Sequence, residues 1–134
     1  MLLTDKVRLI KRKWIMDPRG GFLKLLTGKE EGLPAYSSEF YITTALPGMA
    51  KGGHFHPRAD EWFTLIKGTC QVKLQDIESG EKMTLELRAD DPSTLFVPAG
   101  VAHVFINDGK EDFILCAYSS LLYDPADTVT VELI

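Results

Sequence analysis

The sequence predicts an all-β fold, either a sandwich or a barrel, formed as a single domain over residues 1–134. Three observations support this prediction. Apolar and polar residues alternate with a period of two in many places, and turn-forming residues recur at short intervals. No segment keeps a helical period over any length, and a chain of this size forms one ordinary domain.

Strands are expected where apolar and polar side chains alternate, because successive side chains of a strand point to opposite faces. The clearest case is residues 82–88, where Met83, Leu85 and Leu87 share one face and charged or hydroxyl groups share the other. Near the start of the chain, residues 7–10 fit a strand as well as they fit the end of a short helix. Further strands, from alternation or from β-branched and aromatic composition, are expected at 40–45, 62–66, 70–75, 94–97, 101–106, 113–118 and 129–133.

Turns are expected between these strands, where glycine, proline, asparagine and aspartate gather. These residues favour the backbone angles that tight turns require. Two of the segments, 78–81 and 107–109, have the composition of hairpin turns. The expected turns lie at 17–21, 47–48, 67–68, 78–81, 91–92, 98–100 and 107–109.

Composition and charge exclude several classes of protein. The net charge is −4, and no basic stripe runs along the chain, so nucleic acid is not an expected partner. The short basic run Lys11 to Lys13 is expected to be a solvated edge. No apolar segment is long enough for a membrane span, and residues 1–14 lack a signal peptide's apolar stretch, which favours a cytoplasmic location. Cys70 and Cys116 are expected to be buried free thiols.

Two stretches contain all three histidines of the chain, and with them one carboxylate in a fixed spacing. His54 and His56 are two residues apart, so in a strand they point to the same face. Glu61 opens the next expected strand, and His103 follows the turn at 98–100. A lone histidine is more often a packed residue than a ligand, but this set supplies three imidazoles and a carboxylate. Such donors suit one divalent ion of zinc, manganese, iron, nickel or cobalt.

These two stretches resemble the two motifs of the cupin superfamily. The segment from Gly48 to Gly68 matches G-x5-H-x-H-x4-E-x6-G at every fixed position. The segment up to Asn107 matches G-x5-P-x-G-x2-H-x3-N except that Pro92 stands where the pattern has glycine. The resemblance implies a double-stranded β-helix, the jelly-roll barrel of cupins. It also implies that the metal ligands are His54, His56, Glu61 and His103.

A finer resemblance points to nucleotide-sugar cupins. Residues 17–22, Asp-Pro-Arg-Gly-Gly-Phe, resemble the D-x-R-G-x-F opening of dTDP-4-dehydrorhamnose 3,5-epimerases and of dTDP-4-keto-6-deoxyglucose 3,4-ketoisomerases. Residues 51–56 are similar to the R-G-G-H-x-H stretch of the ketoisomerases, and 123–125 to a Tyr-Asp-Pro near their end. The His-x-His-x4-Glu spacing is closer to the C-terminal cupin of capsular polysaccharide reductases. A plain turn entering a strand is the alternative interpretation of residues 17–22.

The resemblance implies an isomerase or epimerase that acts on a nucleotide-linked 4-keto-6-deoxy sugar in polysaccharide or deoxysugar synthesis. The reaction is proton abstraction next to the ketone, with a metal ion as a Lewis acid. In metal-free relatives the histidine that matches His54 resembles the base. A histidine that holds a metal has no free lone pair, so His54 is either a ligand or the base. Tyr41 and Tyr118, like Tyr36, are candidate general acids.

Three basic residues are candidates for holding the diphosphate of such a substrate: Arg19, Lys51 and Arg58. A solvated surface charge is the alternative interpretation of each. The resemblance further implies a homodimer in which residues 2–16 pair with a partner chain. Two other functions stay open, namely a metal-dependent dioxygenase and a sugar-binding cupin without catalytic activity.

Overall fold

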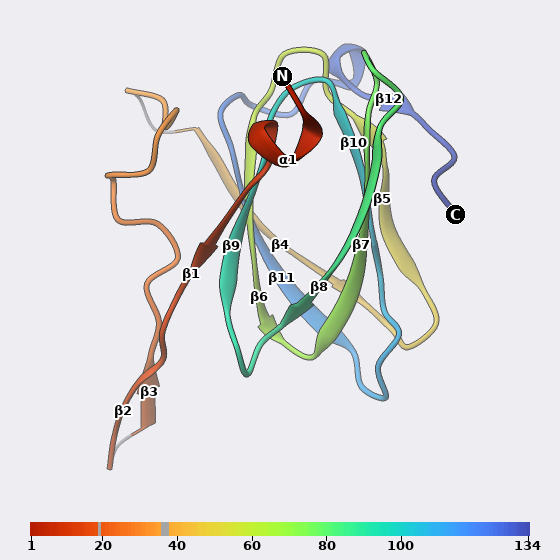
Figure 1. Ribbon diagram of the computed structural model, residues 1–134. Coiled ribbons are helices and arrows are strands. Elements are labelled where there is room, and N and C mark those ends of the chain that lie inside the picture. Colours follow the sequence, from red (N-terminus) through yellow and green to blue (C-terminus); the bar gives the residue numbers. More distant parts are fainter. Residues whose placement is uncertain (19, 36–37) are drawn as a thin grey trace.

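The computed structural model describes residues 1–18, 20–35 and 38–134, and it confirms the all-β prediction. Two five-stranded antiparallel sheets face each other as the walls of a barrel, and a two-stranded hairpin extends from it (Figure 1). The helices and strands in chain order are α1 (Leu3–Lys6), β1 (Arg8–Lys11), β2 (Ile15–Asp17), β3 (Gly20–Phe22), β4 (Glu39–Ala45), β5 (Ala50–Phe55), β6 (Glu61–Lys67), β7 (Thr69–Asp76), β8 (Lys82–Arg88), β9 (Ser93–Val97), β10 (Val101–Ile106), β11 (Phe113–Ser119), η1 (Pro125–Asp127) and β12 (Val129–Thr130).

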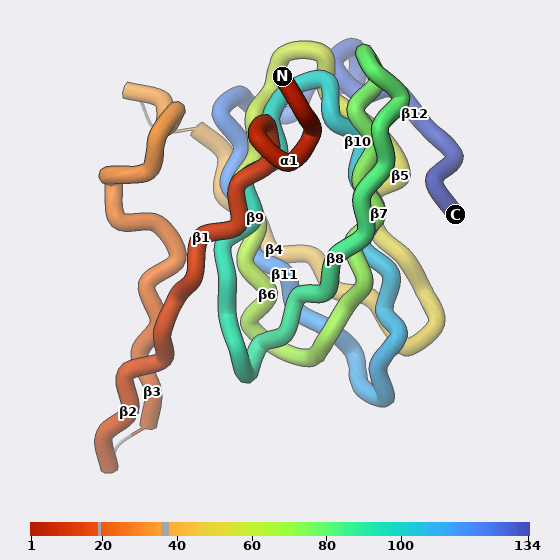
Figure 2. The backbone as a smooth tube through the Cα atoms, viewed as in Figure 1, coloured from red at the N-terminus to blue at the C-terminus, as the bar shows by residue number. Residues whose placement is uncertain are grey.

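The strand order is that of a double-stranded β-helix. One sheet has the order β1-β9-β6-β11-β4 and the other β12-β5-β10-β7-β8, so most neighbours in space are not neighbours in sequence. The backbone trace shows the chain passing back and forth between the two sheets as it winds along the barrel (Figure 2). Near the N-terminus the sequence fits either a short helix or a strand, and the structure has both: the one-turn helix α1 precedes strand β1. The last strand is shorter than expected, because only Val129 and Thr130 pair with β5.

The apolar core fills most of the space between the two sheets. Because alternate side chains of a strand point to the same face, every second residue faces the core. Phe63 and Leu65 on β6, like Leu115 and Ala117 on β11, point inward and are almost fully buried. Beside the core some inward positions carry polar side chains instead, among them Glu61 at the start of β6, next to the core residue Val97. Burial of the apolar residues therefore stabilises the barrel, and the polar inward positions are available for a site. The apolar core comprises Leu3, Val7, Ala45, Phe63, Leu65, Cys70, Val72, Leu74, Leu87, Leu95, Val97, Val101, Phe105, Phe113, Leu115 and Ala117.

A loop formed by residues 24–34 covers the outer face of β6 and β9, and Arg12 fastens it there. The Arg12 guanidinium donates to the Leu25 carbonyl at 2.8 Å, to Glu30 Oε2 at 2.8 Å and to Thr94 Oγ1 at 3.0 Å. Only 11% of the Arg12 side chain is exposed, and 4% of the Glu30 side chain. The expectation of a solvated basic edge at Lys11 to Lys13 is therefore corrected for Arg12, since its partners lie in the loop.

Replacement of Glu30 by glutamine is expected to lower stability at neutral pH and to flatten its dependence on acid. Burial raises the pKa of Glu30, but hydrogen bonds from Arg12 and Thr27 outweigh it and lower the pKa from 4.5 to about 2. Because the folded-state pKa is depressed, this stabilisation is present above about pH 4.5 and is lost as the pH falls towards 2. Urea unfolding at several pH values between 7 and 2.5 measures the difference between the two chains.

The matched control for this prediction is Glu31→Gln, since 85% of the Glu31 side chain is exposed. The free energy of unfolding of Glu30→Gln should approach that of the original chain as the pH falls towards 2.5. The free energy of unfolding of Glu31→Gln should equal that of the original chain at every pH. A constant difference between Glu30→Gln and the original chain at every pH would contradict the assigned ion pair.

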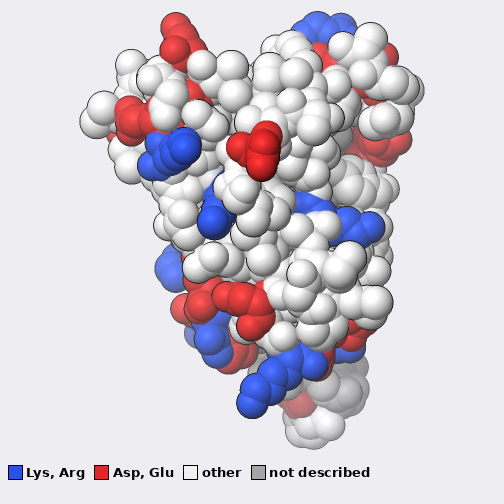
Figure 3. All heavy atoms as spheres, turned by 90° about the vertical axis from the view of Figure 1, so that its right-hand side faces the viewer, with Lys and Arg blue, Asp and Glu red and all other residues white. Residues whose placement is uncertain are grey.

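The surface and the cysteines agree with the expectations from composition. Cys70 and Cys116 are both buried free thiols. Over β5, β12 and the C-terminal segment, the face in Figure 3 carries interspersed basic and acidic side chains without a basic stripe. In the described part of the chain, no helix is both long enough and apolar enough to span a membrane.

Candidate active site

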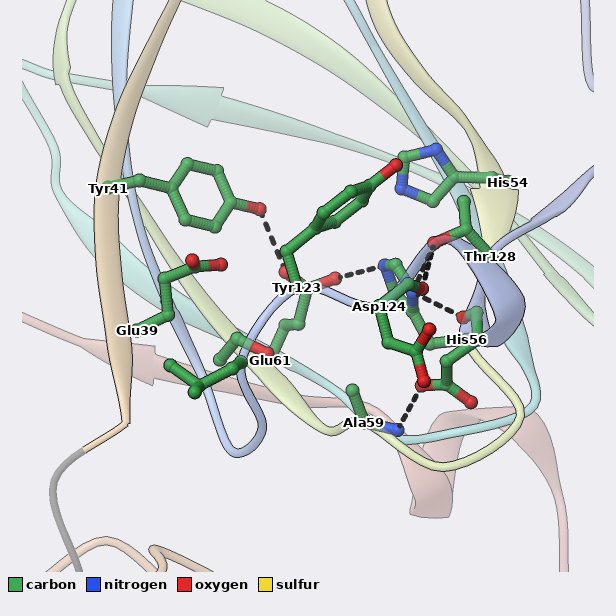
Figure 4. Close-up of a pocket in the computed structure, with 12 residues that line it drawn as sticks. Glu39, Tyr41, His54, His56, Ala59, Glu61, Tyr123, Asp124 and Thr128 are labelled. Carbon is green, nitrogen blue, oxygen red and sulfur yellow. Dashed lines mark hydrogen bonds and ion pairs between the residues drawn. The ribbon is translucent and has the colours of Figure 1, made fainter.

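A cavity of about 480 Å³ lies beside these polar positions. Its wall comes from β4, from β5 with the loop that leads to the start of β6, and from the end of β11 with the segment that follows it (Figure 4). Its lining residues are Glu39, Tyr41, His54, His56, Ala59, Glu61, Ser119, Leu122, Tyr123, Asp124, Asp127 and Thr128.

The four residues expected to bind a metal converge at this cavity. One ligand atom from each of His54, His56, Glu61 and His103 can be chosen so that all four atoms lie within 4.8 Å of one another. The ring centroids of His54 and His56 are 4.8 Å apart, and those of His54 and His103 are 5.0 Å apart. His54 and His103 are cross-strand partners in β5 and β10, and Glu61 comes from the opposite sheet. The topology thus brings together residues far apart in sequence.

A β-bulge sets the direction of His54 on β5. The register between β10 and β5 shifts by one residue, so that His103 pairs with His54 but Val104 pairs with Gly52. Gly52 and Gly53 have φ angles of +93° and +82°, which residues with a side chain rarely adopt. A Cβ on Gly52 would lie 2.8 Å from the carbonyl oxygen of His103. The pair of glycines therefore permits both the bulge and the close approach of the two strands.

Backbone carbonyls fix the ring nitrogens of two histidines. Nδ1 of His56 donates to the Asp127 carbonyl at 2.9 Å, and Nδ1 of His103 donates to the Val101 carbonyl at 3.1 Å. A carbonyl only accepts, so both rings carry their proton on Nδ1. In the neutral rings, the lone pairs on Nε2 then face Oε1 of Glu61, at 2.9 Å from His56 and 3.4 Å from His103.

Oε1 of Glu61 is a buried oxygen that has no hydrogen bond of acceptable geometry in the described structure. Electron pairs of two imidazoles and a carboxylate that point at one region repel each other unless a proton or a metal ion lies among them. The donor set and this unsatisfied oxygen together fit a divalent cation. The distances among the four ligand atoms are also compatible with a single ion.

The protonation states in the cluster follow from burial and from neighbouring charges. Burial, and the charge that His103 and His56 carry whenever they are protonated, lower the pKa of His54 from 6.5 to about 4, so this ring is neutral at pH 7. Burial would raise the pKa of Glu61, but His103 and His56 outweigh burial and hold it below its usual value. Glu61 is therefore a carboxylate and His54 a neutral imidazole, the forms in which both bind metals.

Of the candidate general acids, Tyr41 and Tyr118 are among the described residues, and they occupy different faces of their strands. Tyr41 on β4 points into the cavity and donates a hydrogen bond to Oε2 of Glu61 at 2.8 Å. Burial and the charges of Glu61 and Glu39 raise the pKa of Tyr41, which keeps its hydroxyl protonated. Tyr118 is on the outer face of β11, because Ala117 beside it points inward, and its ring lies 6.0 Å from that of Trp62. The structure does not bring Tyr118 to the cavity.

The three candidate phosphate-binding residues are in different settings. Arg58 lies at the edge of the cavity, 3.1 Å from Asp124 and 3.4 Å from Asp127, with 64% of its side chain exposed. Lys51 lines a second cavity of about 230 Å³, which shares Tyr41 and His54 with the first. Arg19 lies outside the described residues, as does Tyr36.

Asp127 is a site residue that sequence reasoning missed. Its carboxylate accepts hydrogen bonds from the backbone N–H groups of Arg58 at 2.9 Å and Ala59 at 3.1 Å, and its carbonyl holds the ring of His56. One residue thus supports both the ligand His56 and the turn that leads to Glu61. The only signal in the sequence was the similarity of residues 123–125 to the end of sugar cupins, which gives this aspartate no role.

Replacement of Asp127 by alanine is expected to destabilise the protein by about 2–3 kcal/mol, because two N–H groups lose a buried acceptor. It should also weaken metal binding about 10-fold, since the turn that carries His56 is released. Thermal unfolding and a metal-chelator competition titration measure the two effects. Asp124→Ala is the control, because Asp124 is 43% exposed and its carboxylate contacts only the N–H group of Ala126 in η1 and the exposed Arg58, with no contact to a ligand or to the turn before β6. Equal effects of the two substitutions would argue against the supporting role of Asp127.

The fold and the cluster define the class of this protein as a cupin-type barrel with a three-histidine, one-carboxylate site. Residues 15–131 match the family described as the polysaccharide biosynthesis C-terminal domain. Because the match covers most of the chain, the chain belongs to this family.

Individual proteins support the same relationship. The chain is 28% identical over 108 residues to a UDP-2-acetamido-2,6-beta-L-arabino-hexul-4-ose reductase of Pseudomonas aeruginosa, covering 81% of this chain but only 27% of the reductase. It is 26% identical over 124 residues to a TDP-4-oxo-6-deoxy-alpha-D-glucose-3,4-oxoisomerase of Aneurinibacillus thermoaerophilus, covering 91% of this chain and 84% of that enzyme. A crystal structure of a dTDP sugar isomerase from Desulfovibrio desulfuricans superposes with a TM-score of 0.84 at 20% identity, covering 95% and 84% of the two chains. The resemblance to nucleotide-sugar cupins is therefore confirmed.

Proposed function

We propose that this chain is an isomerase or epimerase that acts on a nucleotide-linked 4-keto-6-deoxy sugar, by proton abstraction next to the ketone, in polysaccharide or deoxysugar biosynthesis. The observation that carries the proposal is the cavity, which is lined by three members of the donor cluster, His54, His56 and Glu61, and by a protonated tyrosine, Tyr41. The similarity to an oxoisomerase and to a hexulose reductase, both of which handle nucleotide-linked keto sugars by their names, supports the substrate class.

Four residues would hold one divalent ion of zinc, manganese, iron, nickel or cobalt: His54, His56, Glu61 and His103. A bound ion of this charge supplies Lewis acidity, which lowers the energy of negative charge that develops on a carbonyl oxygen. In this arrangement His54 is a ligand and its lone pair is not free to remove a proton. The base must then be another residue of the cavity wall.

The other residues of the site orient the substrate and move protons. Tyr41 keeps its proton at neutral pH and projects into the cavity, so its hydroxyl serves as the general acid. Tyr123, whose ring lies over the cavity in Figure 4 and is 66% exposed, offers an aromatic face to the nucleotide or the sugar. Arg58, Lys51 and Arg19 are the proposed contacts of the diphosphate.

The test is solvent deuterium incorporation into UDP-, dTDP- and GDP-linked 4-keto-6-deoxy sugars, followed by NMR and mass spectrometry. We expect deuterium at the carbon next to the ketone in at least one of them. No incorporation into any of the three, by protein loaded with each of the five metals, would overturn the proposal. Oxygen consumption with these substrates would instead favour the dioxygenase, and thermal stabilisation without exchange would favour a binding protein.

We propose in addition that the protein acts as a homodimer in the cytoplasm, where nucleotide sugars are available. The exposed edge of β2 and β3, which extends from the barrel in Figure 1, supports pairing with a second chain. Analytical ultracentrifugation tests the dimer, and a sedimentation coefficient of a 15.0 kDa monomer at micromolar concentration would overturn it.

A further inference from the structure

We infer that Glu39 is the general base of this site, the group that removes the proton next to the ketone. The inference rests on the proposed function. If His54 is a metal ligand, it cannot remove the proton next to the ketone, and another residue must do so. Among the described residues of the cavity wall, the other carboxylates and the histidines are committed to other contacts.

The remaining groups of the cavity wall are committed to other contacts. The lone pairs of the three histidines and of Glu61 converge on the metal position. The Asp124 carboxylate binds Arg58 and the N–H group of Ala126, and the Asp127 carboxylate binds two N–H groups of the turn before β6. Tyrosine hydroxyls hold their protons at neutral pH and do not act as bases without a partner.

Glu39 differs from these groups in its surroundings. It is half-buried, lines the cavity, and among the described residues no side chain or backbone group forms a hydrogen bond or ion pair with its carboxylate. A half-buried carboxylate that lacks a partner in the protein is poorly explained by stability alone. A substrate C–H group placed in the cavity would meet an acceptor whose lone pairs are free.

The position of Glu39 relative to Tyr41 suits a pair of proton-transfer groups. The two residues are two apart on β4 and therefore share its inward face. Figure 4 shows both side chains projecting from this strand into the cavity, on the side opposite His54. The charge of Glu39 acts on the Tyr41 hydroxyl, so the two groups are within electrostatic reach. A sugar ring between β4 and the histidines would contact Glu39, Tyr41 and the metal position at once.

The proposed step balances without any additional reactant. The proton next to the ketone moves to a Glu39 carboxylate oxygen, and the C–H electron pair forms the carbon–carbon double bond of an enolate. The carbonyl π pair moves onto the ketone oxygen. Because both groups approach the sugar from one side, the step suits a keto isomerisation. The ketone oxygen takes a proton from Tyr41, the hydroxyl on the neighbouring carbon gives its proton back to Tyr41 as that carbon becomes the new ketone, and the former carbonyl carbon takes the proton held by Glu39, so both side chains end as they began.

The experiment compares Glu39→Gln and Glu39→Asp with the original chain in the deuterium-incorporation assay, each loaded with the same metal. Glu39→Gln is expected to lower the exchange rate at least about 100-fold, since general base catalysis typically contributes 10²–10⁴-fold. Glu39→Asp keeps a carboxylate and should recover part of the rate. Metal content and the dissociation constant of the nucleotide sugar, measured by calorimetry, should stay within about 3-fold in both variants. Glu111→Gln, an exposed carboxylate outside the cavity, is the matched control.

Two results would overturn the inference while the proposed function stands. One is Glu39→Gln protein that exchanges at the rate of the original chain. The other is a loss of exchange that accompanies an equal loss of metal content or of nucleotide-sugar binding, which would mean a structural role. Failure of the original chain itself to exchange would instead overturn the proposed function, and the inference with it.

Discussion

Protein that carries Glu61→Gln is expected to bind divalent metal at least about 100-fold more weakly than the original chain, since loss of an outer partner of a ligand alone typically costs about 10–100-fold. Glu61 supplies the only negative charge of the donor set, and its Oε1 lies 2.9 Å from Nε2 of His56. Competition titration with a chromophoric chelator measures the affinity. The exposed Glu81→Gln serves as the control and should bind metal as the original chain does.

The same substitution should have a different effect on the metal-free protein. A glutamine amide at position 61 can donate hydrogen bonds to the Nε2 lone pairs of His56 and His103, which a carboxylate cannot do. The metal-free variant is therefore expected to lose less stability than the metal-saturated variant does, each measured as the free energy of unfolding relative to the original chain in the same state. Equal destabilisation with and without metal would show that Glu61 has a packing role and no ligand role.

Gly52→Ala is expected to destabilise the protein by about 3 kcal/mol or more, because a residue with a side chain at a left-handed backbone angle alone costs about 1–3 kcal/mol. At this position the new Cβ would also lie 2.8 Å from the carbonyl oxygen of His103. Since both atoms belong to paired strands, relief of the contact displaces His103 from the cluster. Chemical denaturation should therefore show a lower free energy of unfolding, and metal titration should show a lower affinity for the ion.

Gly53→Ala separates the two contributions. Gly53 has a similar φ angle of +82°, but the nearest atom to its Cβ is the Val131 carbonyl oxygen at 3.7 Å, an ordinary contact. We expect a smaller loss of stability, about 1–2 kcal/mol, from backbone strain alone. If Gly53→Ala proved as harmful as Gly52→Ala, close approach of β5 to β10 would not explain the requirement for glycine at position 52.

Strand positions were most predictable where alternation ended in strong turn residues. Strands β8 and β10 begin and end where the sequence predicts them, since a regular pattern runs up to a turn at each end. The last strand was predicted at 129–133 but stops at Thr130. Its partner β5 bulges at Gly53, and a bulge in one strand has no signal in the sequence of the other.

The site was predictable to the extent that it follows a pattern. The spacing of His54, His56 and Glu61 carried the expectation that they converge with His103, and the structure brings all four together. Tyr118 could have been placed by the same period of two, because Leu115 and Ala117 are the apolar positions of its strand. Glu39 and Asp127 are single carboxylates without a motif. Their importance depends on partners that only the folded chain reveals.

The origin of the four donor residues has a mechanical consequence. His54 and His103 belong to one sheet, and Glu61 begins a strand of the other. A cation held by all of them would join the two layers beside the cavity, much as a disulfide links two segments of a chain. Removal of the ion by a chelator would then also free the two sheets to move apart beside the cavity. Loss of metal and local opening of the barrel would therefore occur together.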